Sequence, residues 1–562
     1  MKWIKRDSAC KTIQDVVLRN TPAFSKKNDV YTIKEMDNAV AVLKQFIANG
    51  RPITLIGDYD VDGICAASII FLAITSLGGN VKVRLPRRFS EGFGLSEKIV
   101  GEISEGLLIT VDNGIAAIEA VQKAKDKGLT VIITDHHLRS ESGELPNADI
   151  IIDPNAVPDS ADFTGYCGAG IAYKLATLLL GEGDVLLQKL LSLAAIATVA
   201  DVVPLVEENH SIVRNGLAAM LTEEGRTVGL GALLEVCQMD KFITAKDIAF
   251  KIAPIINASG RLHDDGANIP FALLTFEGSR DAALNMAQNI NETNEQRKAI
   301  KTREMAVIRE TIENEQLERE VPLCVYVPGL SEGLMGIYAG ELVERYKVPS
   351  LVFTDSEDPD IIKGSGRSCG GVHLKSLLDS CSDLLYKYGG HAEAAGVSVE
   401  RNNFEAMKNR LMKCIGSVPK VNDNILYYDL DITVDKIQDA IREMERFAPY
   451  GEGNPEIVFR LLNFNLVERF GSCYKTMGSN GSSIRLFGKD VVAVGFGMTE
   501  RYIAINKPQK VNLVGTLSLN YYQGKTNAQI EIIDIKDVND KTSYGVRLES
   551  PLSMHIANYL DR

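Results

Sequence analysis

The chain has 562 residues, of which 45% are hydrophobic and 24% charged, and this length predicts three or four domains rather than one core. Its net charge of −13 argues against a general nucleic-acid coat protein but allows an enzyme with a local basic groove. The sequence has neither an apolar run of about 18 residues nor a secretory leader, so we expect no membrane contact. Its nine scattered cysteines lack a CxxC pair, which indicates reduced thiols and a cytoplasmic protein.

The segment 50–275 is predicted to form the first domain, with residues 1–49 packing on this core. Short apolar, β-branched runs alternate with helical stretches such as 64–77 and 115–127. This alternation predicts a parallel sheet covered by helices, and the ligand site of such sheets lies beyond the carboxyl ends of the strands. The expected strands are 52–57, 81–85, 107–111, 130–134 and 149–153.

The rest of the chain changes character twice. Residues 165–270 look helical, and the charged stretch 276–320, poor in glycine and proline, predicts a long connecting helix. A second α/β domain is expected over 321–420, with a helix at 335–346. The final domain, 421–562, is dominated by strands and predicts an OB-like β-barrel. Its expected strands are 457–468, 483–487, 490–496, 510–520 and 526–536. The predicted fold class is therefore α/β with a C-terminal barrel.

The first chemical motif is GDYDVDG, in which Asp58, Asp60 and Asp62 alternate before Gly63. It resembles half of a calcium-binding EF-hand loop, but the twelfth position, where that loop needs a bidentate Glu, is Ile69. The aspartates instead follow the predicted strand 52–57. Each could be only a helix N-cap, so a metal site also requires ligands from elsewhere in the chain.

Two further predicted strands end in similar groups. Strand 107–111 is followed by Asp112, and strand 130–134 by Asp135, His136 and His137. Parallel strands deliver these side chains to one edge of the sheet, where clustered carboxylates need cations to stay ionised. Oxygen-rich ligands with imidazole suit Mn²⁺ or Mg²⁺, and two such ions sharing a carboxylate perform phosphoester hydrolysis with water as the nucleophile.

The ordered motifs DYDVDG, VDNG, TDHH and ATVADVVPL resemble those of the DHH phosphoesterase superfamily. The resemblance implies that Asp60, Asp62, Asp112, His136 and Asp201 bind metal, with Asp58 as an additional or supporting ligand. It also implies that His137 supports the site or contacts the scissile phosphate. Asp58, Asp112, His136 and His137 are the expected catalytic residues.

The segments KGSGRS (363–368) and GGHAEAAG (389–396) resemble the DHHA1 substrate-binding domain. Together with the long helix and the barrel, they make the chain similar to the RecJ family of single-strand-specific 5′→3′ DNA exonucleases. By that resemblance Arg88, Arg261, Ser365, Arg367 and His391 hold the 5′-phosphate. The family usually has Trp-His where Leu330 and Ser331 stand here, so the role of that His is open.

The resemblance implies an exonuclease that degrades single-stranded DNA to mononucleotides in recombination and repair, with two Mn²⁺ or Mg²⁺ ions. It further implies a monomer whose partners include single-strand-binding protein and a RecQ-type helicase. In the barrel, the tyrosines 521 and 522 with Lys525 are candidates for stacking on bases, or for packing the barrel end. Two alternatives remain: a DHH phosphodiesterase for short oligonucleotides or cyclic dinucleotides, and an inert Cdc45-like replication scaffold.

Overall fold

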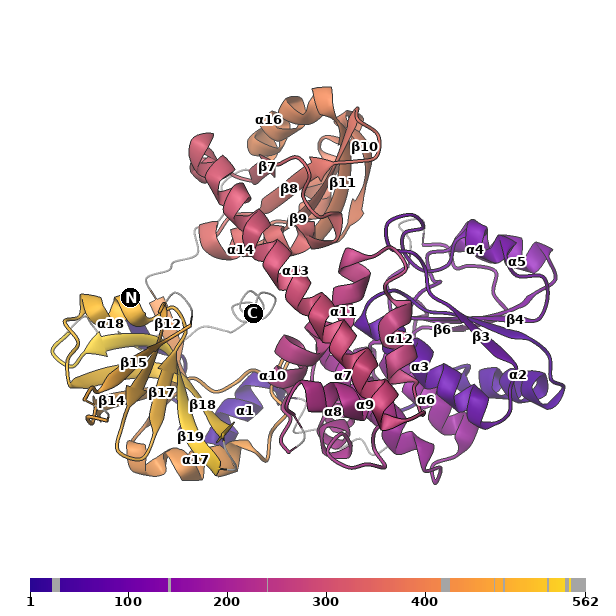
Figure 1. Cartoon of the computed structure of the whole chain (residues 1–562). Coiled ribbons are helices and arrows are strands. Elements are labelled where there is room, and N and C mark those ends of the chain that lie inside the picture. Colours follow the sequence, from indigo (N-terminus) through magenta and orange to yellow (C-terminus); the bar gives the residue numbers. More distant parts are fainter. Residues whose placement is uncertain are drawn as a thin grey trace. The chain divides into compact units, whose positions relative to one another are not determined.

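The computed structural model describes residues 1–22, 31–139, 143–239, 241–415, 425–469, 471–478, 481–522, 525–540 and 545–546 (Figure 1). The chain divides into two compact units. The larger contains Tyr31–Asp201 and Asn215–Val421, and the smaller contains Met1–Val30, Val202–Arg214 and Asn422–Ser553. None of the helices in these described ranges combines the length and apolar character that a membrane span requires.

The larger unit begins with a five-stranded parallel sheet in the order β3-β2-β4-β5-β6. Continuous apolar runs form its central strands because both faces of the sheet are covered. The strands are β2 (Ile53–Ile56), β3 (Val81–Arg84), β4 (Leu107–Val111), β5 (Thr130–Thr134) and β6 (Ile150–Ile152). The predicted ranges for β4 and β5 are confirmed to the residue.

Helices cover both faces of this sheet, as Figure 1 shows. One face packs on α4 (Glu97–Gly101) and α5 (Ile118–Asp126), whose apolar side chains share a core with β2, β4 and β5. The other face packs on α2 (Met36–Ala48), α3 (Val61–Ser76) and α6 (Gly168–Leu180). The helix α7 (Leu186–Ala200) packs on α3 and α6.

A group of helices follows the sheet and leads into the long helix α13 (Arg280–Asn314). The first of them are α8 (Glu207–Ala219), α9 (Val228–Val236), α10 (Ala245–Asp247), the π-helix η2 (Ile248–Ile252), α11 (Ala253–Leu262) and α12 (Asn268–Leu274). α13 packs on α9 and α11 near its start and on β7 (Leu323–Tyr326) near its end. The predicted connecting helix is therefore present.

The second α/β sheet has the order β10-β11-β9-β8-β7, in which only β7 and β8 pair in parallel. Its further strands are β8 (Ser350–Asp355), β9 (Ile361–Arg367), β10 (Leu385–Gly390) and β11 (Ala394–Glu400). Its helices are α14 (Met335–Tyr346), α15 (Leu374–Asp379) and α16 (Phe404–Cys414). Most of the glycine-rich stretch KGSGRS therefore lies on a strand, β9, and GGHAEAAG spans the end of β10, the hairpin turn and the start of β11.

The smaller unit is built on a seven-stranded sheet in the order β13-β14-β18-β19-β17-β16-β15. Its strands are β13 (Leu430–Ile432), β14 (Phe459–Asn465), β15 (Tyr474–Met477), β16 (Ser483–Phe487), β17 (Val492–Gly495), β18 (Lys510–Tyr522) and β19 (Lys525–Asp537). Two helices, α17 (Ile437–Met444) and α18 (Thr499–Ala504), accompany them. The expected five strands are confirmed, and β13 and β15 add to them. The side chains of residues 521, 522 and 525 lie outside the described residues.

The N-terminal segment differs from the expectation that residues 1–49 pack together on the first domain. β1 (Lys2–Lys5) pairs with β12 (Ile425–Tyr428) and β20 (Gly545–Val546), and α1 (Ile13–Asn20) joins the core of the smaller unit. The cause is Trp3, which is fully buried and donates from Nε1 to Asp534 Oδ2 at 2.7 Å. Of the segment, α2 and residues 31–33 before it contact the first domain: α2 packs on α6, and Ile33 forms a β-bridge with Ala161.

Candidate metal centre and phosphate-binding arginines

The acidic side chains gather where the chain reverses its winding direction across the sheet. From β2 the chain crosses to β3 on one side, and it then returns to β4 on the other side. The carboxyl ends of β2 and β4 therefore border the crevice in which open α/β sheets bind ligands. Asp58, Asp60 and Asp62 follow β2, and Asp112 follows β4.

Local hydrogen bonds fix the turn from β2 into α3. Asp60 is the N-cap of α3, and its Oδ1 accepts from the Gly63 amide at 3.1 Å. Asp58 Oδ1 accepts from the Tyr59 amide at 2.8 Å. A Cβ on Gly63 would lie 2.5 Å from the Asp58 nitrogen, so a residue without a side chain is required there.

The third aspartate is held by another helix. Asp62 is 2% exposed, and its two carboxylate oxygens accept from the Gly168 and Ala169 amides at 2.6 and 2.7 Å. These amides are the first of α6, and the positive end of the helix dipole favours a carboxylate there. α6 therefore orients Asp62 from a position more than a hundred residues along the chain.

Asp112 has a strained backbone. Its φ of 61° lies in the left-handed region, and its amide donates to the Thr134 carbonyl at 3.0 Å. Such conformations persist where the surroundings over-determine them, and they cluster at functional sites. Gly168 packs against this residue, since a Cβ added there would lie 2.5 Å from Asp112 Cβ.

Replacing Gly168 by alanine should displace Asp112 and Asp62 together. We expect a loss of roughly 1–3 kcal/mol in the free energy of unfolding and a marked loss of activity, because the new methyl overlaps a packed side chain. Gly170→Ala is the matched control in the same helix, where the nearest atom to an added Cβ is 3.5 Å away. Thermal melting and activity assays of both variants check this prediction. An equal loss in the two variants would contradict the close packing of Gly168 on Asp112.

His136 completes the cluster from the end of β5. Its Nε2 lies 3.2 Å from Asp112 Oδ1, and 3.7 Å from both Asp62 Oδ2 and Asp201 Oδ2. Asp112 Oδ1 and His136 Nε2 are buried and have no hydrogen-bond partner among the described residues. A buried polar atom without a partner is costly, so these two atoms indicate a ligand that is polar and positively charged.

The protonation behaviour of the carboxylates supports the same conclusion. Burial, with the charge of Asp60, raises the pKa of Asp58 to about 7. Burial, with the charges of Asp62 and Asp60, raises the pKa of both Asp112 and Asp201 well above the usual range. Burial lowers the pKa of His136. The cluster therefore resists carrying all its negative charge unless cations neutralise it.

The donor atoms fall into groups suited to two divalent cations. Asp58, Asp60 and Asp112 form one group, and Asp62, His136 and Asp201 form another, with the donor atoms of each within 4.8 Å of one another. Asp112 is also grouped with His136 and His137, so it lies between the two sets. Carboxylate oxygens with one imidazole fit Mn²⁺ or Mg²⁺.

His137 is held by the carboxylate before it. Asp135, which is 1% exposed, accepts from the Ile115 amide at 3.0 Å and lies 2.7 Å from His137 Nδ1. Burial opposes the charge of His137, but the bond to Asp135 raises its pKa to about 9. With Nδ1 engaged, Nε2 is the nitrogen available to a substrate oxygen.

Arginine side chains lie beside the acidic cluster. Arg88 stacks on the Tyr59 ring, with its guanidinium carbon 4.6 Å from the ring centroid. Burial, with repulsion by Arg88, Arg297 and Arg367, lowers the pKa of Arg261 to about 9. We call these four residues the arginine cluster; Arg297, on α13, was not predicted from the sequence.

Ser365 and Arg367 are two residues apart on β9, so they project from the same face of the sheet. Both face Gly336 of α14, where an added Cβ would lie 3.0 Å from Arg367 Nη2 and 3.3 Å from Ser365 Oγ. His391 differs from them. It is exposed in the β10–β11 turn, and its hydrogen bonds in the described part of the chain are backbone bonds to Ala394 and Lys375.

Known protein families match three parts of this chain. The DHH family, N-terminal domain, matches residues 52–198, the DHHA1 domain matches 320–417, and the RecJ OB domain matches 428–534. The single-stranded-DNA-specific exonuclease RecJ of Dickeya dadantii is 31% identical over 527 residues, which cover 88% of this chain and 89% of the relative. The chain belongs to the RecJ family.

Other RecJ proteins show similar agreement. The RecJ exonuclease of Escherichia coli is 30% identical, and the match covers 89% of this chain and 90% of the relative. The Bacillus subtilis exonuclease is 32% identical over 90% of this chain, which spans 64% of that relative. The crystal structure of Thermus thermophilus RecJ in complex with Mn²⁺ matches with a TM-score of 0.74 at 27% identity, over 90% of this chain and 72% of that one.

Mg²⁺ is also found in a RecJ structure, again from Thermus thermophilus, with a TM-score of 0.68, 26% identity and coverage of 90% of this chain and 70% of that one. The predicted fold class, family and divalent cofactor are thus confirmed. Assignment of individual ligands stays a prediction.

Ser331, at the position where the RecJ family usually has His, binds a buried carboxylate. Its amide and hydroxyl donate to Glu304 of α13 at 2.8 and 2.9 Å, and Tyr338 donates to the same carboxylate at 2.8 Å. Gly333, two residues on, accepts from Arg261 Nη1 at 3.3 Å. This segment therefore ties α13 to the arginine that the sequence predicted.

Arg84, at the end of β3, and Arg88, in the loop after it, have different surroundings. Arg84 pairs with Glu91 at 2.9 Å and Glu102 at 3.1 Å, so it stabilises the loop after β3. Arg88 lacks such a pair in the described part of the chain and stacks on Tyr59 instead. Sequence alone could not separate them, because the acidic partners follow at irregular spacing.

Proposed function

We propose that this RecJ-family chain hydrolyses single-stranded DNA from the 5′ end, releases mononucleotides and acts in DNA recombination and repair. Its family membership and the two donor groups for divalent cations support this activity. The arginine cluster supports a substrate that carries phosphate at the end of the strand.

One observation carries the proposal furthest. Tyr59 stands between Asp58 and Asp60 in sequence, and its ring supports Arg88. A phosphate held by Arg88 would therefore lie next to a phosphate held at the metal donors. Neighbouring phosphates of a strand are separated by one nucleotide, so cleavage there releases a mononucleotide.

We assign the cofactor to Asp58, Asp60, Asp62, Asp112, His136 and Asp201, as two Mn²⁺ or Mg²⁺ ions. Bound divalent cations neutralise phosphate charge and lower the pKa of water. The chain contributes the rest: α6 orients Asp62, the left-handed turn orients Asp112, and Asp135 orients His137. Asp135 holds His137 at Nδ1, so that Nε2 is the nitrogen that can contact a phosphate oxygen.

The smaller unit matches the RecJ OB domain, and we propose that it binds the strand by base stacking and backbone contacts. By family resemblance, single-strand-binding protein and a RecQ-type helicase are proposed partners, and the chain acts as a monomer. The nine cysteines are unpaired, which suits a cytoplasmic enzyme. We also propose the domain ranges 1–49, 50–275, 276–320, 321–420 and 421–562, with the first divided as described above.

A 5′-labelled single strand of several tens of nucleotides, incubated with Mn²⁺ or with EDTA, tests this function. We expect stepwise release of labelled mononucleotide in Mn²⁺ and no release in EDTA. Cleavage confined to very short oligomers or cyclic dinucleotides would favour the phosphodiesterase alternative. Strand binding without metal-dependent cleavage would favour the scaffold.

A further inference from the structure

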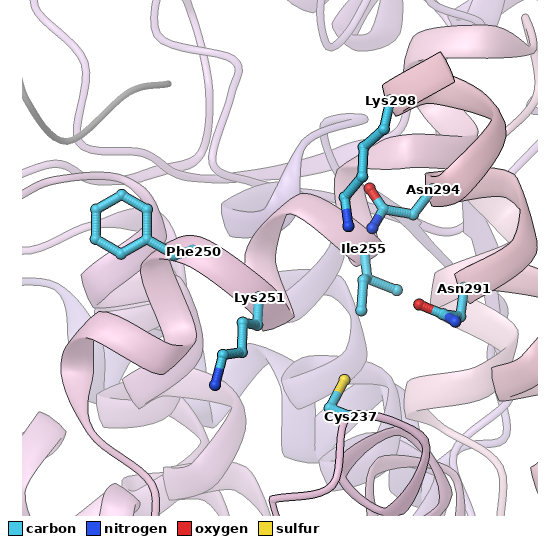
Figure 2. Close-up of a pocket in the computed structure, with 7 residues that line it drawn as sticks. All are labelled: Cys237, Phe250, Lys251, Ile255, Asn291, Asn294 and Lys298. Atoms are coloured by element: carbon cyan, nitrogen blue, oxygen red, sulfur yellow. The ribbon is translucent and has the colours of Figure 1, made fainter. Parts of the chain in front are cut away.

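The connecting helix α13, which the structure describes along its whole length, buries two polar side chains, Asn294 and Glu304. Asn294 accepts from Arg297 of the same helix at 3.1 Å, and Figure 2 shows it with Lys298 and Ile255 in the lining of a pocket of about 170 Å³. Glu304 lies about three turns further along α13 and is 7% exposed. A buried carboxylate is costly unless it accepts hydrogen bonds, so its donors show what it holds.

The donors to Glu304 come from the segment that leads into α14. Ser331 donates twice, from its amide at 2.8 Å and from its hydroxyl at 2.9 Å. Tyr338, which is fully buried, donates from its hydroxyl at 2.8 Å. Within the described residues, Glu304 forms an ion pair with Arg303, but the atoms are 3.7 Å apart and the Arg303 side chain is 73% exposed, so this pair contributes little. Three hydrogen bonds therefore fix Ser331 relative to α13.

The residues after Ser331 contact Arg261. They form the 3₁₀ helix η4 (Glu332–Leu334), which packs on α11, the helix that carries Arg261. The Gly333 carbonyl accepts from Arg261 Nη1 at 3.3 Å, and a Cβ on Gly333 would lie 2.1 Å from the Arg261 carbonyl oxygen. The two backbones thus touch, and a displacement of Ser331 displaces the carbonyl that holds the Arg261 guanidinium.

We propose that Glu304 is a positioning residue for Arg261 and that it acts through Ser331 and η4. A guanidinium binds phosphate oxygens through donors in a fixed plane, and a displacement of about 1 Å caused by a distant change can cost much of such a contact. Glu304 thereby makes strand binding depend on the connecting helix. This inference rests on the proposed function, because it concerns an arginine with which the chain holds the strand.

A double-mutant cycle with Arg261 tests the proposal by binding, without relying on cleavage. The protein is the full chain with Asp112→Ala, and the probe is a 5′-phosphorylated single strand of several tens of nucleotides. We expect Glu304→Ala to weaken binding about tenfold, the effect of one charged hydrogen bond. Combined with Arg261→Ala, the same change should weaken binding less than about twofold, because the side chain that Glu304 positions is gone.

The cycle separates positioning from a contribution to stability alone. Glu304→Ala leaves buried donors without an acceptor, so its melting temperature should fall by the same amount with and without Arg261→Ala. The loss of binding should occur only where Arg261 is present. An equal loss of binding in both backgrounds, or unchanged binding in Glu304→Ala, would overturn the proposal.

Glu304→Gln is the conservative variant, and Glu310→Ala is the matched control. Glutamine keeps one acceptor oxygen and offers a donor to the Ser331 hydroxyl, so we expect binding within about threefold of the parent protein. Glu310 is exposed on the same helix, and Glu310→Ala should bind like the parent. A loss in Glu304→Gln or in Glu310→Ala as large as in Glu304→Ala would mean that the charge of α13 acts instead of the hydrogen bonds, and would contradict the proposal.

Ser331→Ala replaces Glu304→Ala in the cycle if that variant fails to fold. It removes one of the three hydrogen bonds to Glu304, and the Ser331 amide still donates. We expect a loss of binding of about threefold, the effect of one hydrogen bond, and no loss when Arg261→Ala is already present. Equal losses in the two backgrounds would again contradict the proposal.

The cleavage assay keeps this inference separate from the proposed function. If the wild-type chain cleaves the strand in Mn²⁺ and the cycle shows no coupling between Glu304 and Arg261, the inference fails and the exonuclease activity stands. If the wild-type chain does not cleave, the proposed function fails, and the coupling measured by binding still decides whether Glu304 positions Arg261.

Discussion

Replacing Asp112 by alanine is expected to abolish strand cleavage while single-stranded DNA binding persists. Asp112 Oδ1 is buried and has no hydrogen-bond partner in the part of the chain that the structure describes. It lies 3.2 Å from His136 Nε2, between the two donor groups. Losing it removes a ligand from the group with Asp58 and Asp60, and it removes the carboxylate beside His136 of the second group. Since metal ions contribute several kcal/mol to such reactions, we expect the rate to fall at least about a thousandfold.

The expectation that Asp112→Ala still binds single-stranded DNA follows from charge. Asp112→Ala removes a carboxylate from the strand's path, so affinity should stay the same or rise. Asp126→Ala, at the exposed end of α5, is the control for removing an aspartate from the same domain and should keep the full rate. Wild-type cleavage by Asp112→Ala would contradict the assignment of this residue as a shared ligand.

Mn²⁺ is expected to raise the melting temperature strongly. Without cations, the buried Asp58 and Asp112 and the half-buried Asp60 and Asp201 lie together with raised pKa values, which costs folding free energy. A cation that binds only the folded state at a hundred times its dissociation constant adds about 2.7 kcal/mol. For a unit of this size we expect a rise of roughly 3 °C for each cation bound.

The stability of the metal-free protein should also depend on pH, and it should fall as the pH rises. The folded pKa of Asp58, about 7, exceeds its ordinary value of 3.8, so this group stabilises the metal-free fold below about pH 4, and the contribution is lost as pH rises through 7. His137, raised from 6.5 to about 9, loses its contribution between those two values. Both effects make the metal-free protein less stable at pH 7.5 than at pH 5.5.

Melting in EDTA and in Mn²⁺ at these two pH values checks the prediction. The rise caused by Mn²⁺ should be larger at pH 7.5, where the carboxylates give up protons most readily. Asp112→Asn should melt higher than wild type in EDTA, because it removes a buried charge, and should respond less to Mn²⁺. A metal-free protein that is more stable at pH 7.5 than at pH 5.5 would contradict this account of the cluster.

The sequence allowed the sheet and its chemistry to be predicted because their signals are local. Apolar runs marked the strands of the first domain, and polar residues directly after β2, β4 and β5 marked the site edge. The structure brings Asp58, Asp60, Asp62, Asp112, His136 and Asp201 together as expected. It also places Arg88, Arg261 and Arg367 near one another, but it shows no such contact for His391 in the described residues.

The remaining features depend on contacts that leave no local pattern. The amides of α6 that hold Asp62 are separated from it by more than a hundred residues, and Gly168 looks like any helical glycine. Arg297 is one of many charged residues on a polar helix, and only packing of α13 on α11 distinguishes it. The burial of Trp3 could not be predicted from its neighbours in sequence, because its hydrogen-bond acceptor, Asp534, lies 531 residues away.

The central claim is that residues from three strand ends and α7 hold two divalent cations. Crystals of the full chain grown with Mn²⁺, measured at the manganese absorption edge, test it most directly. We expect two anomalous peaks, one among Asp58, Asp60 and Asp112 and one among Asp62, His136 and Asp201. Manganese bound elsewhere, with no peak at these residues, would contradict the account.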